Sequence, residues 1–78
     1  WKGQPNGHIP DLQTRDHICE VETADSLYIQ QTEDQFKLFD AFARQEKKTF
    51  LVVVPKNAET DATRRILELR LAAKVWAL

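Results

Sequence analysis

The run TFLVVV at residues 49–54 constrains the fold of this chain more than any other feature. All of its residues are apolar or β-branched, and Pro55 ends it. An uninterrupted run of this kind is typical of a strand in the middle of a sheet with both faces covered. We therefore predict a central strand at Thr49–Val54, with a layer of structure on each side of it.

Two further strands are predicted before this run and one after it. They cover Gly7–Gln13, His17–Thr23 and Val75–Leu78, and the polar residues 14–16 suit a tight turn between the first two. One helix is predicted before residues 49–54 in the sequence and one after them, so the order of elements along the chain is β-β-α-β-α-β. A strand, helix, strand connection favours a right-handed crossover, so we expect an α/β fold with a mixed sheet that includes a β-hairpin.

Helical spacing of apolar residues marks both helices. Phe36, Phe39 and Ala43 predict the first, from Thr32 to about Glu46. Residues 32–35, Thr-Glu-Asp-Gln, have the form of a capping box at its start. After the polar loop 56–59, the second helix begins near residue 60, and its apolar repeat is formed by Ala62, Ile66, Leu69 and Ala73.

The hairpin gathers three acids. If residues 15 and 16 are the central turn residues, Asp11 faces Glu20 and the pleat places Glu22 on the same side. Neighbouring carboxylates disfavour full ionisation unless a cation compensates their charge. Oxygen ligands of this kind suit magnesium or manganese. The sequence therefore predicts a divalent metal site on this face of the hairpin.

The other face of the hairpin is predicted to be the core face. It carries Pro10, Leu12, Cys19 and Val21. An alternative is that the acids only form the wet side of an antiparallel hairpin, because alternating polar residues are typical of half-exposed strands. The same alternation places His8 and His17 away from the acids, so we expect surface or strand-end histidines there.

Composition narrows the function classes. The net charge is −1 and the pI is near 6.1, which argues against coating nucleic acid by bulk positive charge. A single cysteine permits no internal disulfide, so we expect a buried thiol and a cytoplasmic protein. No apolar run approaches the length of a membrane span. The chain has no methionine and begins at Trp1, from which we expect a segment to be missing before it.

The hairpin, the first helix and the next strand together resemble the PD-(D/E)xK nuclease superfamily, the restriction-endonuclease-like fold. In that family an aspartate after proline on one strand and an acidic-x-lysine on the next form the metal site. Pro10-Asp11 and Glu20-Val21-Glu22 match these motifs, except that Glu22 stands where lysine is usual. The family's first helix would precede Trp1. The resemblance implies that residues 1–78 are a single nuclease-like core without that helix.

By this resemblance, Asp11, Glu20 and the carbonyl of Val21 would bind Mg²⁺ or Mn²⁺, and Glu22 would orient or deprotonate the attacking water. Gln35 would position water or DNA backbone, or would only complete the capping box. The implied function is metal-dependent hydrolysis of DNA phosphodiester bonds by an endonuclease. The alternatives are an inactive module of the same fold, which binds nucleic acid or protein, and a small α/β protein whose hairpin is only structural. The expected partners are DNA and either a second subunit or the missing segment, with no membrane.

Overall fold

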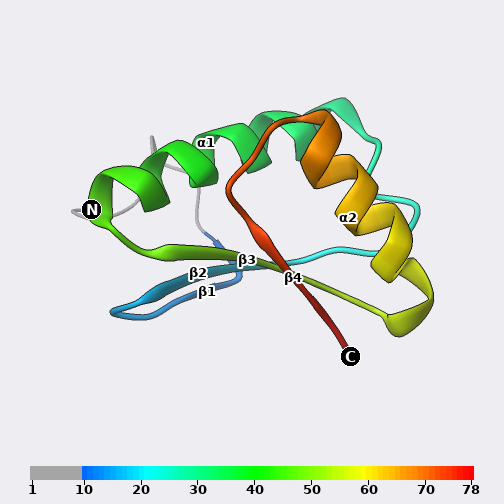
Figure 1. Cartoon of the computed structure of the whole chain (residues 1–78), viewed down its shortest axis with the longest axis horizontal. Helices are drawn as coiled ribbons and strands as arrows, with labels where there is room; N and C mark the ends of the chain where they lie inside the picture. Colours follow the sequence, from blue (N-terminus) through cyan, green and yellow to red (C-terminus); the bar gives the residue numbers. More distant parts are fainter. Residues whose placement is uncertain (1–9) are drawn as a thin grey trace.

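The computed structural model describes residues 10–78, which form a mixed α/β fold (Figure 1). The strands are β1 (Leu12–Gln13), β2 (His17–Val21), β3 (Thr49–Val54) and β4 (Lys74–Ala77). The helices are α1 (Gln30–Glu46) and α2 (Glu59–Glu68), and the short 3-10 helix η1 (Lys56–Ala58) precedes α2. The predicted order of strands and helices is confirmed.

The sheet follows the order of the chain, β1-β2-β3-β4. β1 and β2 are antiparallel, whereas β3 is parallel to both β2 and β4. Leu12 pairs with Cys19, which is the register predicted from a turn at residues 15 and 16. The amide of Thr14 donates to the carbonyl oxygen of His17 at 2.9 Å and closes this turn. β3 is a central strand, as the apolar run predicts.

Both helices lie on the same side of the sheet (Figure 1). Two successive right-handed crossovers that move in one direction across a sheet place their helices on one face. Phe50, Val52 and Val54 of β3 point into the helix layer and are almost fully buried. The two helices therefore do not form layers on opposite faces of β3, because no helix among residues 10–78 covers the other face.

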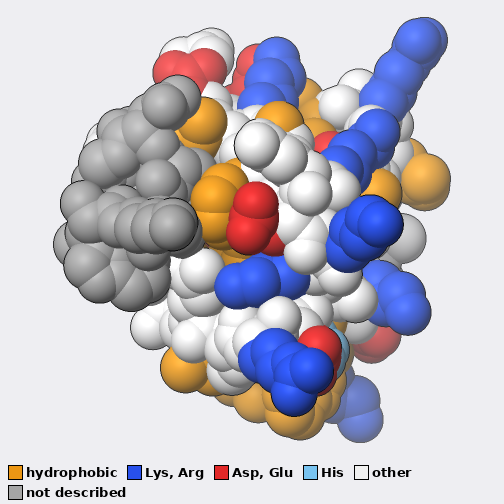
Figure 2. Space-filling model, turned by 90° about the vertical axis from the view of Figure 1, so that its left-hand side faces the viewer, with side chains coloured by type: hydrophobic (Ala, Val, Ile, Leu, Met, Phe, Trp, Pro, Cys, Tyr) orange, Lys and Arg blue, Asp and Glu red, His pale blue; other side chains and the backbone are white. Residues whose placement is uncertain are grey.

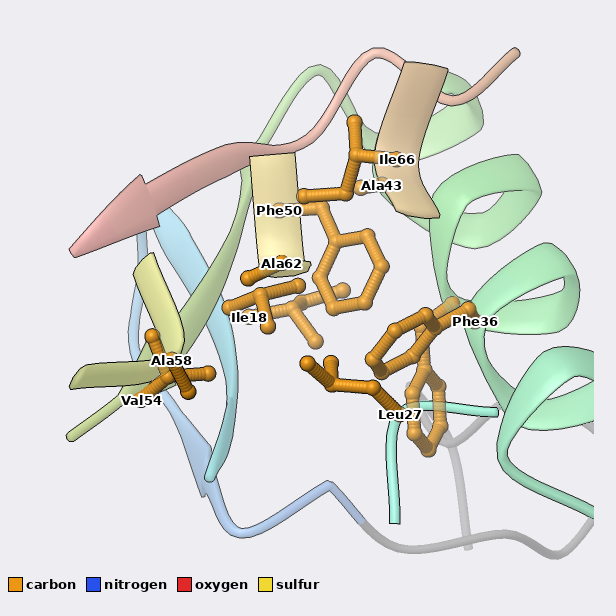
Figure 3. Packing of buried hydrophobic residues seen from close by; sticks show 11 residues of the cluster. Ile18, Leu27, Phe36, Ala43, Phe50, Val54, Ala58, Ala62 and Ile66 are labelled. Carbon is orange, nitrogen blue, oxygen red and sulfur yellow. The ribbon is translucent and has the colours of Figure 1, made fainter. Parts of the chain in front are cut away.

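The core lies between the sheet and the two helices (Figure 3). Its centre is aromatic: the ring of Phe50 meets those of Phe36 and Phe39 edge-on, with centroids 5.7 and 6.1 Å apart. Edge-to-face contacts of this kind stabilise aromatic pairs beyond the effect of burial alone. Ala62 and Ile66 of α2 complete the layer, and the small alanine brings the helix close to the sheet.

The predicted core face of the hairpin is not the face that packs against the helices, although Pro10 and Cys19 are buried as expected. Ile18 is fully buried against the helices, and Glu20 lies on the same side of β2. Leu12 and Val21 point to the opposite side, where each remains 55% exposed. This opposite side, which we call the open face, carries six apolar residues, of which Cys19 and Val53 are buried: Leu12, Cys19, Val21, Leu51, Val53 and Trp76. The polar residues His17, Thr49 and Lys74 share this face where β2, β3 and β4 begin.

The predicted capping box is also wrong. α1 begins at Gln30, with Ile29 as its N-cap, so Thr32 lies within the first turn and is buried. The helix begins earlier than predicted because Leu27 is buried in the core, which fixes the position of the chain just before α1. The Nε of Arg65 in α2 donates to the Leu27 carbonyl oxygen at 3.1 Å and holds the anchor in place.

Both helices end in the same hydrogen-bonded motif. In α1, Lys47 has a φ of 57°, and the amides of Lys47 and Lys48 donate to the carbonyl oxygens of Arg44 and Ala43. In α2, Arg70 has a φ of 56°, and the amides of residues 70 and 71 donate to the carbonyl oxygens of residues 67 and 66. These are Schellman motifs. The second ends α2 at Glu68, so the prediction that Ala73 belongs to this helix is wrong.

Candidate acidic site

Three acidic residues lie close together at the end of the hairpin opposite its turn. We call Asp11, Glu20 and Glu22 the acid cluster. The amide of Asp11 donates to Glu20 Oε1 at 3.0 Å, and the amide of Val21 donates to Asp11 Oδ2 at 2.8 Å. Side-chain carboxylates thus accept from the main-chain amides of residue 11, just before β1, and of residue 21, at the end of β2. The hairpin register brings the predicted residues together, as the sequence indicates.

The site lies at the carboxyl end of β2, on the helix side of the sheet. Glu20 pairs with Val52 in the parallel register, and it shares its face with the core residue Ile18. Its side chain is consequently buried, with 5% of the residue exposed. The corrected orientation of the hairpin therefore places Glu20 at the edge of the core, with Glu22 half-buried and Asp11 exposed beside it.

Burial determines the protonation of Glu20. Desolvation raises the pKa of its carboxyl from 4.5 to about 7, although the Asp11 amide opposes the shift. The neighbouring charges of Asp11 and Glu22 raise it further. Glu20 in its acid form shares a hydrogen bond with Glu22, whose own pKa is also raised by burial. Near neutral pH, a proton between Glu20 and Glu22 therefore offsets the repulsion within the cluster.

Ser26 completes the site and was not foreseen from the sequence. Its hydroxyl donates to Glu22 Oε1 at 2.7 Å and accepts from the amide of Thr23 at 3.0 Å. These bonds fix Glu22 against the turn that follows β2. The signal in the sequence was a serine four residues after an acid within a polar turn, a pattern too common to single out.

The cluster has oxygen donors of the kind that hard cations prefer. Asp11 Oδ2 and Glu20 Oε1 each already accept from an amide, and Glu22 Oε1 accepts from Ser26. Within residues 10–78, no three acidic, histidine or cysteine side chains are arranged to hold a metal ion. The donor type thus fits magnesium or manganese, but a cation would have to displace the shared proton and draw the carboxylates together.

The other candidate residues lie apart from the cluster. Gln35 is half-buried in the second turn of α1, and within the described range it makes no hydrogen bond to the acids. Since the helix begins at Gln30, Gln35 does not complete a capping box either. His17 is exposed at the start of β2, away from the acids as predicted, and His8 lies outside the described residues.

Comparison with known proteins gives no family assignment. Neither protein-family models, nor curated proteins, nor solved structures match this chain. Among residues 10–78, no helix has the length and apolar character needed to cross a bilayer. What can be said of function therefore rests on the acid cluster and on the surfaces around it.

Proposed function

We propose that this chain is a metal-dependent nuclease-like domain that hydrolyses DNA phosphodiester bonds. The observation that carries the proposal is the hydrogen-bonded acid cluster, in which the hairpin brings Asp11 beside Glu20, and Glu22 follows at the end of β2. Carboxyl groups with raised pKa values in one cluster are typical of functional sites. The match of Pro10-Asp11 and Glu20-Val21-Glu22 to the nuclease motif supports the choice of reaction.

Asp11, Glu20 and the Val21 carbonyl would hold a Mg²⁺ or Mn²⁺ ion. Such an ion lowers the pKa of bound water and stabilises charge on a scissile phosphate. Glu22 would accept the proton of the attacking water, since its pKa is raised and Ser26 fixes its orientation. A role for Gln35 rests on the resemblance alone.

Calorimetric titration with manganese chloride at pH 8 tests the proposal. We expect weak binding by the parent protein, and no heat above dilution for Glu20→Ala, because the loss of one strand's carboxylate leaves too little charge to replace water around the ion. Cleavage of plasmid DNA should be lost in the same variant. Glu46→Ala is the matched control, because Glu46 is exposed at the end of α1 and forms no ion pair within the described residues.

The Glu22→Lys variant tests whether the site is catalytically active or inactive. It supplies the family's usual third residue, so DNA cleavage that persists or increases supports the nuclease proposal. If the parent and Glu20→Ala give the same flat manganese titration and neither cuts DNA, the nuclease proposal fails. The domain is then an inactive module of the kind considered next.

The exposed apolar residues of the open face support a second candidate function, that of an interaction module. Leu12, Val21 and Trp76 are each more than half exposed on this face. Exposed apolar patches of this kind mark interaction sites. We propose that a second copy of the chain covers this face in the silent-module alternative.

Sedimentation equilibrium measures this association. We expect a species with twice the 9.1-kDa mass of the chain, and a monomer after Trp76→Lys, because a buried charge opposes the apolar contact. Leu67→Lys is the control, since Leu67 is 72% exposed on α2, away from the open face. A well-folded parent protein that remains monomeric at all concentrations contradicts the dimer.

A further inference from the structure

The residues of the open face form rows across the sheet, as the strand pairing requires. Two of these rows are apolar apart from one lysine: Leu12, Cys19, Leu51 and Lys74 in the first, and Val21, Val53 and Trp76 in the second. A third row, His17 and Thr49, lies where β2 and β3 begin. Successive rows are about 7 Å apart, because each lies two residues further along the strands. The face is therefore polar at the end where the strands begin, and Lys74 and Trp76 are neighbours on β4.

The strands offer positive but no negative charge on the open face. None of the strand residues on this face is acidic, although the chain has 12 aspartate and glutamate residues. Lys74 is exposed and forms no ion pair within residues 10–78. Figure 2 is viewed from the end at which β2 and β3 begin, and hydrophobic side chains follow its lower edge, on the side of the sheet away from the helices. A ligand on this face can therefore combine apolar contact with negative charge.

Trp76 is the exposed aromatic residue of the open face. It lies on the edge strand β4 and is 58% exposed, and no aromatic ring or cationic group of the described residues stacks on its indole. Its partner in β3, Val53, is buried and supports the ring from the side. Exposed aromatic rings beside positive charges bind single-stranded nucleic acid, because each base has a flat face that stacks and each linkage carries a phosphate.

A single strand fits this face better than a duplex or a second copy of the chain. The bases of a duplex stack on one another, so they do not present their flat faces to a protein ring. A second copy would bring no acidic strand residue of its own open face to Lys74, whereas a nucleic acid brings phosphates. Leu12 and Val21 directly follow Asp11 and Glu20 in the sequence, so the open face borders the acid cluster at the edge strand β1.

We infer that the open face binds single-stranded nucleic acid, with a base stacked on Trp76 and a phosphate at Lys74. The choice of nucleic acid as partner rests on the proposed function, whereas binding at this face requires neither metal nor cleavage. Rows about 7 Å apart are separated by about twice the ~3.4 Å rise between stacked bases. The bound strand is therefore extended, with its bases unstacked from one another. In the inactive-module alternative, a second copy of the chain occupies the same face instead.

Fluorescence anisotropy with a labelled oligothymidylate of about 12 nucleotides, in EDTA, tests the inference. Trp76→Leu should weaken binding at least about tenfold, because it removes the ring but keeps an apolar side chain. Trp76→Phe should bind nearly as the parent does, since it keeps a ring, and comparing these two variants separates stacking from apolar contact. Lys74→Gln should reduce the slope of log K against log salt by about 0.7, the contribution of one phosphate contact in a single strand.

Tyr28→Leu and Lys56→Gln are the matched controls, and both should bind as the parent does. Tyr28 is 48% exposed beside Arg65 of α2, and Lys56 is exposed in η1. Equal affinities of Trp76→Leu and Trp76→Phe, tighter binding of a duplex of the same length, or parent protein that dimerises or binds phosphatidylserine vesicles but not the oligonucleotide would each overturn the inference. Oligonucleotide binding without manganese-dependent cleavage would sink only the nuclease proposal. Plasmid cleavage by a parent protein that does not bind the oligonucleotide would sink only the open-face site.

Discussion

Phe50→Ala is expected to lower the free energy of unfolding by about 3–5 kcal/mol, the usual range for truncating a buried phenylalanine. Phe50 is 2% exposed, and its ring contacts those of Phe36 and Phe39 in α1. Loss of this ring removes the aromatic contacts between α1 and the central strand. A domain of this size has about 4–12 kcal/mol of total stability, so the variant should lose a large share of it.

Urea denaturation followed by circular dichroism measures this effect. Leu67→Ala serves as the control, because a side chain 72% exposed on α2 should change the unfolding free energy by less than about 0.5 kcal/mol. Phe50→Leu should lie between the two, since it retains most of the apolar volume. If Phe50→Ala unfolds at the same urea concentration as the parent, the core is not organised around the Phe50 ring.

The second large effect is a loss of stability as pH rises, caused by Glu20. In the folded protein its pKa is about 7, against 4.5 in the absence of burial. Between these pH values the folded state holds a proton that the unfolded state has released, so the free energy of unfolding falls with rising pH. Each pKa unit corresponds to ~1.36 kcal/mol, so the decrease approaches about 3 kcal/mol above pH 7.

Glu20→Gln should remove most of this pH dependence and raise stability at pH 8 by about 2–3 kcal/mol. The amide can accept from the Asp11 amide and donate to Glu22, as the protonated acid does, without carrying charge. Denaturation at pH 5 and pH 8 gives the comparison. The lowered pKa of Glu33, caused by its hydrogen bond with Lys37, affects stability only at more acidic pH. A variant with the pH dependence of the parent would show that Glu20 is ionised throughout.

The same substitution links stability to the proposed function. Glu20→Gln should fold better than the parent at pH 8 yet bind manganese no better than Glu20→Ala, because an uncharged amide cannot offset the charge of a cation. A group that destabilises the fold in its ionised form is expected where function, rather than folding, requires the charge. Glu20 is therefore the residue at which the nuclease proposal is most directly tested.

Local patterns in the sequence determined the elements and their order. The run at Thr49–Val54 predicted a central strand because β-branched residues without polar alternation are disfavoured at a sheet edge. The spacing of Phe36, Phe39 and Ala43 correctly identified the buried stripe of α1. The turn at residues 15 and 16 established the hairpin register, and with it the meeting of the three acids, since register depends only on turn length and the pleat.

Only the tertiary structure decided which face of the hairpin is buried. Each face carries both apolar and polar residues: Ile18 accompanies Glu20 on one, and Val21 accompanies His17 on the other. The pleat sorts the residues into faces without indicating the direction of the core. That direction follows from the two crossovers, which place α1 and α2 on one side of the sheet. Because this is the acid side, packing buried Glu20, raised its pKa and left the apolar open face without a helix to cover it.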